Sequence, residues 1–384
     1  MRRAPTDPLP GAPDPWAASE MPAFRSRPPY LMSDMIAAEP ALAERLVRRF
    51  AADETLGVLA DAVRAAAAAG KPIMTTGCGT SEHAAMAVAA LLEEALDGPE
   101  VRTVQALESL RRPMADGLLI AVSHEGGTLA TNAALEAARA AGARTALVTV
   151  SAGSPGAALA DLVVRTEEMD QSWCHTVGYL SPVVAGVMLG LRVAGRRSDA
   201  PAIRSALEAN DDHRGPASLA AGLTGTDRIA VVGSGPDFVT ARELALKISE
   251  GARLPAAAYD VETILHGHLA AATRWTGLVL IATDEALRPA AIGERARSVL
   301  AAAGAIRMPA AAILGERTAA SIPDEATPAG RIVLARSTRV TAVTAALLGP
   351  MLPLQLLADR LARARGVNPD TLGREDPAQA AAHG

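Results

Sequence analysis

The stretch PIMTTGCGTSEHAAMAVAALLEEAL, residues 72–96, contains the pattern that decides the fold. It begins with a short apolar run that is typical of a buried strand. It continues through a glycine-rich turn, Gly77-Cys78-Gly79-Thr80-Ser81, and ends in a long alanine- and leucine-rich segment with a helical pattern. Strands that alternate with helices predict a parallel sheet covered by helices on both faces.

The same pattern continues along the chain and then returns. Further strands are expected at LLIAVS (118–123), TALVTVS (145–151) and DLVVRT (161–166). A second series follows with RIAVVGSG (228–235), LVLIAT (278–283), PAAAILG (309–315) and RIVLARS (331–337). Gly77 of the first series and Gly233 of the second lie 156 residues apart. The chain therefore contains an internal duplication, and we expect an α/β protein with two tandem parallel sheets.

A length of 384 residues is enough for two domains with cores of their own. Prolines cluster near the start, so a mobile tail is expected there. One long helix is expected from Val340 to Arg365. The domain limits that we predict are a tail (1–29), two entry helices packed on the first domain (30–70), the first domain (71–210), the second domain (211–366) and a C-terminal tail that contributes to the site (367–384).

Composition excludes several classes of function. A net charge of −5 and few aromatic residues argue against a nucleic-acid partner. The longest apolar run, about residues 180–191, is too short to span a bilayer and contains Pro182, so a buried helix and no membrane partner are expected. Cys78 and Cys174 form neither a metal-ligand spacing nor a disulfide framework. No signal peptide is visible, so we expect a cytoplasmic protein with reduced thiols and no bound metal.

Two glycine-rich turns follow predicted strands and precede predicted helices. The first is residues 77–81, GCGTS, and the second is residues 123–128, SHEGGT. Such turns offer backbone N–H groups, hydroxyls and a positive helix end to an anion, although turns of this kind also serve tight packing alone. The first turn matches neither a P-loop nor the three-glycine dinucleotide spacing, so no nucleotide cofactor is expected. Together the two turns predict a crevice for a small polar ligand.

A third stretch, LALKISEGARLPAAAYDVETILHGH (244–268), carries groups suited to proton transfer. Lys247 and Glu250 lie three residues apart on a predicted helix and therefore project from one face. The helix is expected to give way to an extended segment that carries Glu262 and ends at His266. A lysine, a carboxylate and an imidazole are the side chains that general acid–base catalysis uses. The alternative is a solvated helix followed by a loop with surface histidines.

Five motifs in order resemble the tandem SIS (sugar isomerase) family, which includes the isomerase half of glucosamine-6-phosphate synthase. The resemblance extends from about residue 30 to residue 370. The matching segments are YLMSDMIAAEPALAERLV (30–47), GCGTS (77–81), SHEGGT (123–128), ELALKISEGARLPAAAYDVETILHGH (243–268) and GVNPDTL (366–372).

The resemblance implies roles at the matching positions. Glu250 would be the base that moves a proton between two carbons of an enediol, with Lys247 beside it. His266, reaching in from a neighbouring subunit of a homodimer, would open the sugar ring. The phosphate would be held by the two loops, whose candidate residues are Cys78, Gly79, Thr80, Ser81, Ser123, His124, Glu125 and Thr128.

Three departures from the family pattern affect what it implies. Glu125 stands where the family usually has a phosphate-binding serine, and a carboxylate there repels phosphate unless it is offset or points to solvent. The family's C-terminal lysine aligns best with Arg374, which stays protonated and forms no Schiff base. Residue 2 is Arg2 rather than a nucleophilic cysteine, so we expect no glutaminase domain before the tandem unit.

The sequence therefore predicts an isomerase or deaminase that acts on a ketose or amino-sugar phosphate without a cofactor. An aldose–ketose isomerase, a deaminating isomerase and a deglycase all remain open, because one base-mediated proton shift serves each of them. The main alternative is a non-catalytic sensor of a sugar phosphate, and a structural dimer with a degenerate pocket is a third. In the stretch 172–179, Trp173 and His175 are candidates to line the pocket or to serve structure alone.

Overall fold

The structure is a computed structural model that describes residues 16, 23–166, 168–210, 212–284, 289–335 and 337–382. It divides into two compact units, which are described here one at a time. The first unit contains Trp16 and residues 38–171 and 177–204. The second contains residues 23–37, 172–176 and everything from Ser205 onwards.

The sheet of the first unit has five parallel strands in the order β2-β1-β3-β4-β5. The strands are β1 (Ile73–Gly77), β2 (Val101–Gln105), β3 (Leu118–Val122), β4 (Arg144–Thr149) and β5 (Leu162–Arg165). Every residue of β3 is buried, as expected for a central strand covered on both faces.

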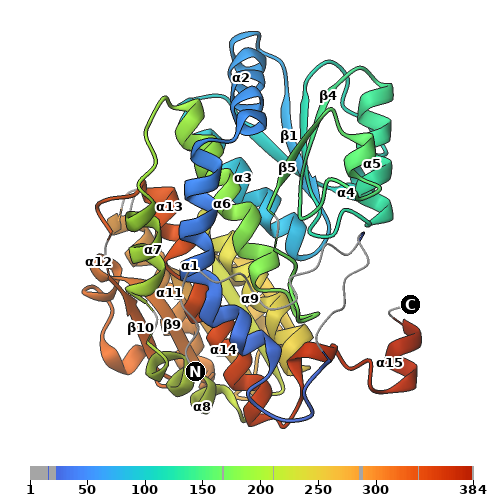
Figure 1. Ribbon diagram of the computed structural model, residues 1–384. Helices are drawn as coiled ribbons and strands as arrows, with labels where there is room; N and C mark the ends of the chain where they lie inside the picture. The colour runs from blue at the N-terminus through green and yellow to red at the C-terminus, as the bar shows by residue number, and fades with distance from the viewer. Residues whose placement is uncertain are drawn as a thin grey trace. The chain divides into compact units, whose positions relative to one another are not determined.

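Helices cover both faces of this sheet. Helix α5 (Leu129–Ala140) lies on one face (Figure 1). Its Leu135 shares one apolar cluster with Leu119 and Leu147 of the sheet. The other face is covered by α2 (Glu54–Ala68), α3 (Thr80–Leu96) and α6 (Val177–Val193). The apolar helix α6 is buried along most of its length, which confirms the buried helix expected around residues 180–191. Shorter elements of this unit are α4 (Ala106–Ser109) and η1 (Ala157–Leu159).

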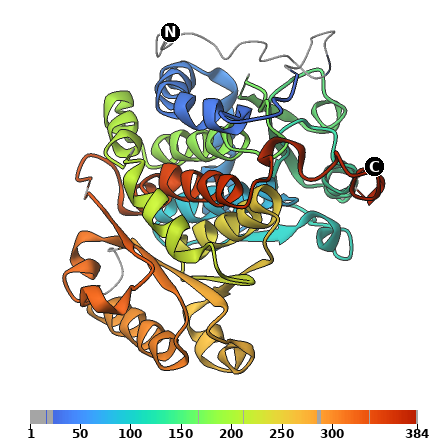
Figure 2. The same ribbon diagram turned by 90° about the horizontal axis from the view of Figure 1, so that it is seen from below.

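The second unit also has five parallel strands, in the order β10-β9-β8-β6-β7. They are β6 (Arg228–Gly233), β7 (Ala256–Asp260), β8 (Thr276–Ala282), β9 (Ala310–Gly315) and β10 (Arg331–Leu334). Figure 2 shows helices on both faces of this sheet. One apolar cluster joins it to α8 (Arg214–Leu223), α9 (Pro236–Ala252) and α14 (Met351–Ala364), and the other joins it to α10 (Val261–Leu265) and α11 (Pro289–Ile306).

The remaining elements are short or lie at the margins of the two units. They are α7 (Ala200–Glu208), η2 (His268–Ala271), α12 (Glu316–Ala319), η3 (Asp324–Ala326), α13 (Ala342–Leu348), η4 (Pro369–Thr371) and α15 (Pro377–Ala382). Within the described residues, the stretch Ala342–Ala364 is long and apolar enough to cross a membrane. However, 83% of its apolar window is buried inside the protein, as in a core helix.

The two units repeat one another in backbone detail. Gly79 (φ 57°, ψ −130°) and Gly235 (φ 59°, ψ −131°) take the same glycine conformation before α3 and α9. A Cβ on Gly77 would lie 2.6 Å from the carbonyl oxygen of Ser81, and one on Gly233 would lie 2.4 Å from that of Asp237. Each strand-to-helix turn therefore requires glycine for the same two reasons, and the predicted duplication into two parallel α/β sheets is confirmed.

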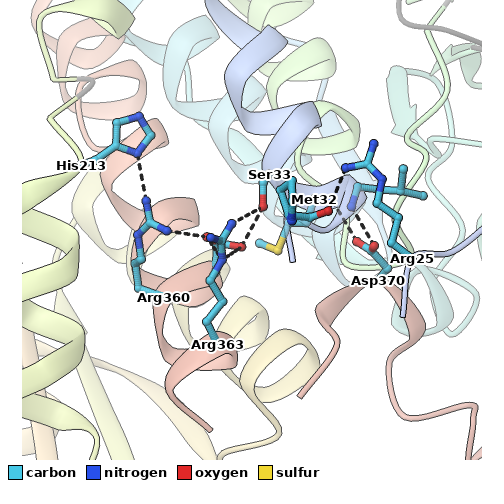
Figure 3. Close-up of polar contacts among 10 residues, drawn as sticks. Arg25, Met32, Ser33, His213, Arg360, Arg363 and Asp370 are labelled. Carbon is cyan, nitrogen blue, oxygen red and sulfur yellow. Dashed lines mark hydrogen bonds and ion pairs between the residues drawn. The ribbon is translucent and has the colours of Figure 1, made fainter. Parts of the chain in front are cut away.

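Helix α1 (Leu31–Ala51) begins on a carboxylate from the other end of the chain. The Asp370 side chain accepts hydrogen bonds from the backbone N–H of Leu31 (2.8 Å) and Met32 (2.9 Å), as Figure 3 shows. Next to it, the buried Asp359 accepts from Ser33 (3.0 Å) and pairs with Arg363 (2.9 Å). These bonds explain why the first turns of α1 belong to the second unit, rather than to the first domain as the sequence suggested.

Three other expectations differ from the structure. The edge strands β2 and β7 were not expected, because each has only five residues and most of them are partly exposed. The single helix expected from Val340 to Arg365 is broken at Gly349-Pro350 into α13 and α14. Glu262 lies in helix α10 rather than in an extended segment, because the Asp260 side chain accepts a hydrogen bond from the N–H of Glu262 (2.9 Å) and starts a helix there.

Candidate functional site

The first glycine-rich loop runs from the end of β1 into α3. Gly79 is exposed, and α3 begins at Thr80 without a side-chain cap. Cys78 is half-buried, with its Sγ 3.7 Å from the hydroxyl of Thr131 and 3.6 Å from the amide nitrogen of Gln105. The loop therefore presents the positive end of a helix of 17 residues, which favours an anion.

The second loop lies next to the first, because β1 and β3 are paired neighbours in the sheet. Its backbone reaches across: the N–H of His124 donates to the hydroxyl of Ser81 (3.3 Å). Within the loop, the buried Ser123 hydroxyl donates to that of Thr128 (3.4 Å), and α5 also begins without a side-chain cap. Three hydroxyls and two helix N-termini therefore meet at one edge of the sheet, as the sequence predicted for the two loops.

The two charged or titratable residues of the second loop behave differently. Glu125 is exposed. His124 is buried, and its Nε2 accepts a hydrogen bond from the backbone N–H of Asp170 (2.9 Å), while Asp170 in turn accepts from Gly178 at the start of α6 (3.0 Å). The imidazole of His124 therefore joins the second loop to the segment after β5. Its Nε2 is engaged by the Asp170 N–H and does not face a ligand.

Trp16 is a contact of the second loop that the sequence did not indicate. Its indole N–H donates to the carbonyl oxygen of Glu125 (2.6 Å), and its ring lies against Gly127. Residues 1–15 and 17–22 of the predicted tail lie outside the described residues. Trp16 itself is 45% exposed. A lone tryptophan in a proline-rich stretch carries no signal that would have placed it on this loop.

The second unit contains a charged cluster on α9. Lys247 is fully buried, and its Nζ lies 2.6 Å from Oε2 of Glu250 and 3.6 Å from Oε1 of Glu243. Glu243 is also buried, whereas the side chain of Glu250 is 26% exposed. Burial acts to lower the pKa of Lys247, but the charges of Glu250, Glu243 and Cys174 outweigh it, so its pKa is raised above the usual value. Lys247 is therefore expected to be cationic at neutral pH.

The loop 172–176 supplies an imidazole to this cluster. His175 is partly buried, and this burial together with the neighbouring charge of Lys247 lowers its pKa to about 4, against a smaller opposite effect of Glu243. Cys174 packs against α9, since a Cβ on Gly251 would lie 3.2 Å from its Sγ. His175 is thus neutral at physiological pH and lies beside Lys247, which places one of the two candidates from the stretch 172–179 at the charged cluster.

His266 and Glu262 form a separate surface group on α10. The side chain of His266 is 77% exposed, and its Nε2 lies 3.3 Å from Oε2 of Glu262. Glu262 is held on both oxygens by Arg295 at 2.5 Å, and this hydrogen bonding lowers its pKa. None of the contacts described for these three residues joins them to Lys247 or Glu250. Glu262 therefore belongs to a surface ion-pair network rather than to the cluster on α9.

The candidate residues thus form three groups. The two loops belong to the first unit, and the charged cluster and the surface group belong to the second. No group of three or more His, Cys, Asp and Glu side chains suited to a metal ion occurs within the part of the chain that the structure describes. The chemistry available is that of a carboxylate held by a buried cation beside a neutral imidazole, which is the equipment of proton transfer.

The fold consists of two parallel α/β sheets, and two loops at the strand ends of the first sheet suit an anion. Proteins of this class bind small polar ligands at such strand ends. Residues 68–192 match the family model of the SIS domain. Residues 68–192 are therefore a SIS domain, and the second parallel sheet repeats its α/β fold in tandem.

The chain is similar in sequence to curated glutamine–fructose-6-phosphate aminotransferases. The chain is 30% identical over 230 residues to a glutamine–fructose-6-phosphate aminotransferase (isomerizing) of Symbiobacterium thermophilum, a match that covers 56% of this chain and 38% of the relative. It is 29% identical over 320 residues to the corresponding protein of Gloeobacter violaceus, covering 78% of this chain and 50% of the relative. The chain thus spans half or less of the length of the curated relatives it matches.

Solved structures share the fold over almost the whole chain. The C-terminal domain of glucosamine-fructose-6-phosphate aminotransferase from Francisella tularensis has a TM-score of 0.75 at 18% identity, covering 90% of this chain and 99% of that one. The tagatose-6-phosphate ketose/aldose isomerase of Escherichia coli has a TM-score of 0.69 at 18% identity, covering 92% and 97%. A glucosamine-6-phosphate deaminase of Thermotoga maritima has a TM-score of 0.65 at 17% identity, covering 89% and 97%.

Proposed function

We propose that this chain is an enzyme that isomerises or deaminates a ketose or amino-sugar phosphate through an enediol or enolamine. The observation that carries the proposal is the pairing of Glu250 with Lys247. A fully buried, positively charged lysine holds one oxygen of a carboxylate that is itself partly exposed. A protein that only senses a ligand has no need of a carboxylate positioned in this way.

Glu250 acts as the base in this proposal. Lys247 donates to Oε2, so Oε1 is left to take a proton from a carbon next to the substrate carbonyl and to return it to the neighbouring carbon. The positive charge of Lys247 lies where negative charge develops as the enediolate forms, and in a buried site such charge stabilisation is strong. The neutral His175 beside Lys247 adds no second cation to compete for the Glu250 carboxylate.

The loops of the first unit hold the phosphate. The hydroxyls of Ser81, Ser123 and Thr128 and the starts of α3 and α5 supply hydrogen-bond donors and a positive helix field. The exposed position of Glu125 supports this assignment, since a carboxylate that lies in solvent repels a bound phosphate less than a buried one does. His266, exposed on α10, opens the sugar ring in the partner subunit of a homodimer.

The test uses ligand binding and proton exchange together. A panel of hexose and amino-sugar phosphates is first screened by thermal shift, because a ligand that binds the folded state raises the apparent melting temperature. Ligands that bind are then incubated with the enzyme in D₂O, where a base-mediated proton shift introduces deuterium at the reacting carbon. Binding of a sugar phosphate without exchange or turnover would favour the sensor.

The variant Glu250→Gln identifies the base. It keeps the shape of the side chain but cannot accept a proton, so we expect unchanged ligand binding and a loss of exchange of about 10²- to 10⁴-fold. Glu262→Gln tests the other candidate carboxylate of the same unit, which is engaged with Arg295 and with the proposed ring-opening residue His266. Loss of activity in Glu262→Gln with an active Glu250→Gln would move the base to α10.

A further inference from the structure

The C-terminal segment 371–375 places a second cation close to the charged cluster on α9. The guanidinium carbon of Arg374 lies 4.2 Å from the centre of the Trp173 ring. Trp173 is fixed on two further sides: its backbone N–H donates to the carbonyl oxygen of Asp370 (3.1 Å), and Phe24 meets its ring edge-on with 4.8 Å between the ring centres. Arg374 therefore rests on a rigid aromatic platform.

Arg374 has no anionic partner among the described residues, unlike the nearby Arg253 and Arg363. Arg253 pairs with Glu375, and Arg363 pairs with Asp359. Arg365 donates to the carbonyl oxygen of Ala252 (2.9 Å). The Nε of Arg374 is buried without a hydrogen-bond partner in the described part of the chain; that of Arg253 is too, but Arg253 also donates through Nη2 to Thr371 and Glu375. A guanidinium carries five N–H donors, and leaving a buried one unmet costs free energy.

Two sets of contacts locate Arg374 at the end of α9 that carries Glu250. Arg253 lies three residues after Glu250, about one helical turn further on. A Cβ on Gly373, the residue before Arg374, would lie 3.6 Å from the guanidinium of Arg253. On the other side, Trp173 is two residues from His175, which lies beside Lys247. The contacts with Arg253 and with Trp173 thus both place Arg374 near Glu250, the proposed base.

The chemistry of a stacked guanidinium indicates what it binds. The Trp173 ring covers one face of the Arg374 guanidinium. The N–H groups at the edge of the guanidinium form a fork that matches the two oxygens of a carboxylate. The side chain is always protonated, so its ligand is an anion. The phosphate of the proposed substrate is assigned to the loops of the first unit, which leaves a second anionic group for Arg374.

We propose that Arg374, positioned by Trp173, binds a carboxylate of the ligand that occupies the Lys247–Glu250 site. This inference rests on the proposed function and narrows its substrate to a sugar phosphate that also carries a carboxylate. The carboxylate comes from one of two sources, an amino acid joined to the sugar through nitrogen or an oxidised carbon of the sugar itself. Either source supplies the same two oxygens to the guanidinium edge.

The experiment compares ligands that differ only in the carboxylate. One pair is the 1-deoxyfructose 6-phosphate adduct of glycine and that of glycinamide. The second pair is 6-phosphogluconate and sorbitol 6-phosphate. Dissociation constants are measured by calorimetry for the wild type, Arg374→Ala, Arg374→Lys and Trp173→Leu. Arg253→Ala is the matched control, because it removes a nearby cation whose charge Glu375 already neutralises.

We expect the wild type to prefer the acid member of at least one pair, and Arg374→Ala to weaken that member by about 10- to 100-fold while changing the neutral member little. Arg374→Lys and Trp173→Leu give intermediate losses, since the first keeps the charge without the fork and the second removes the platform. Arg253→Ala keeps the preference. Preference in the first pair assigns the carboxylate to an amino acid, and preference in the second assigns it to the sugar.

Two results would overturn the inference. If the wild type binds both members of each pair equally, or if Arg374→Ala weakens acid and neutral members alike, Arg374 does not recognise a carboxylate. Glu250-dependent deuterium exchange on an uncharged sugar phosphate would then leave the proposed function standing. If no sugar phosphate binds, with or without a carboxylate, both proposals are wrong. Melting curves without ligand show whether each variant is folded.

Discussion

Replacing Lys247 by methionine tests the electrostatics of the charged cluster most directly. The substitution keeps most of the side-chain volume but removes a fully buried cation that lies 2.6 Å from Glu250 and 3.6 Å from Glu243. Glu250 is partly exposed and can be solvated, whereas Glu243 is almost completely buried. Most of the loss in the free energy of unfolding therefore comes from Glu243, because its carboxylate stays buried while the neighbouring charge of Lys247 is removed.

Breaking a buried ion pair in this way costs about 3–5 kcal/mol. That is a large share of the total stability of a domain, which is roughly 5–15 kcal/mol, so Lys247→Met should fold but unfold at much lower urea concentration. The double variant Lys247→Met with Glu243→Gln removes the Glu243 charge as well. We expect it to regain much of the lost stability, because no uncompensated buried charge is left and a neutral amide costs less to bury than a carboxylate.

The stability difference between Lys247→Met and the wild type should depend on pH. Without Lys247, burial raises the pKa of Glu243 in the folded state above its unfolded value, so the folded protein binds the extra proton more tightly. The stability difference from the wild type should therefore be large at pH 7.5 and smaller at pH 5. Urea unfolding at both pH values measures it. An equal loss at both values, or a double variant no more stable than Lys247→Met, would refute this account of the cluster.

Three further outcomes are expected. The folded pKa of His175 is about 4, below the ordinary 6.5, so this residue alone should remove about 3 kcal/mol of stability as the pH falls from 7 to 4. In urea titrations the wild type should therefore lose about that much more than His175→Leu over this range. Gly126 has φ 74°, and a Cβ there would lie 2.2 Å from the Ser154 hydroxyl, so Gly126→Ala should lower the free energy of unfolding by about 2–4 kcal/mol. Gly142 has φ 95° but open space around it, so Gly142→Ala should lower it by only about 1–2 kcal/mol. If His266 acts across a two-fold interface, equal amounts of inactive His266→Ala and Glu250→Gln subunits should regain about a quarter of wild-type turnover after exchange, and no recovery would place both residues in one subunit.

Local patterns in the sequence predicted much of this structure. The strand–GCGTS–helix order was enough to locate the first loop, because its glycines are required by the backbone at Gly77 and Gly79 whatever surrounds them. The three-residue spacing of Lys247 and Glu250 was enough to predict that they meet. Glu243, four residues before Lys247, follows the same rule and could have been predicted from its spacing.

Contacts between distant segments could not be predicted in the same way. His175 and Lys247 are 72 positions apart, and only the packing of loop 172–176 on α9 brings them together. The stacking of Arg374 on Trp173 depends equally on the path of the C-terminal segment. The edge strand β7 escaped detection for a different reason: its sequence, AAAYD, has few strand-forming side chains and owes its conformation to pairing with β6.

The hydrogen bonds from Leu31 and Met32 to Asp370 have a consequence for how this gene product can be divided. A fragment that starts at Ser205 contains every strand of the second sheet, yet it lacks the partners of the Asp370 carboxylate and the loop that carries His175. Asp370 is fully buried in the intact protein, so a truncation after the first sheet would remove the Leu31 and Met32 N–H donors of its carboxylate. The duplicated halves are therefore not interchangeable modules, and chimeras that exchange one half should also carry residues 23–37 and 172–176 from the same parent.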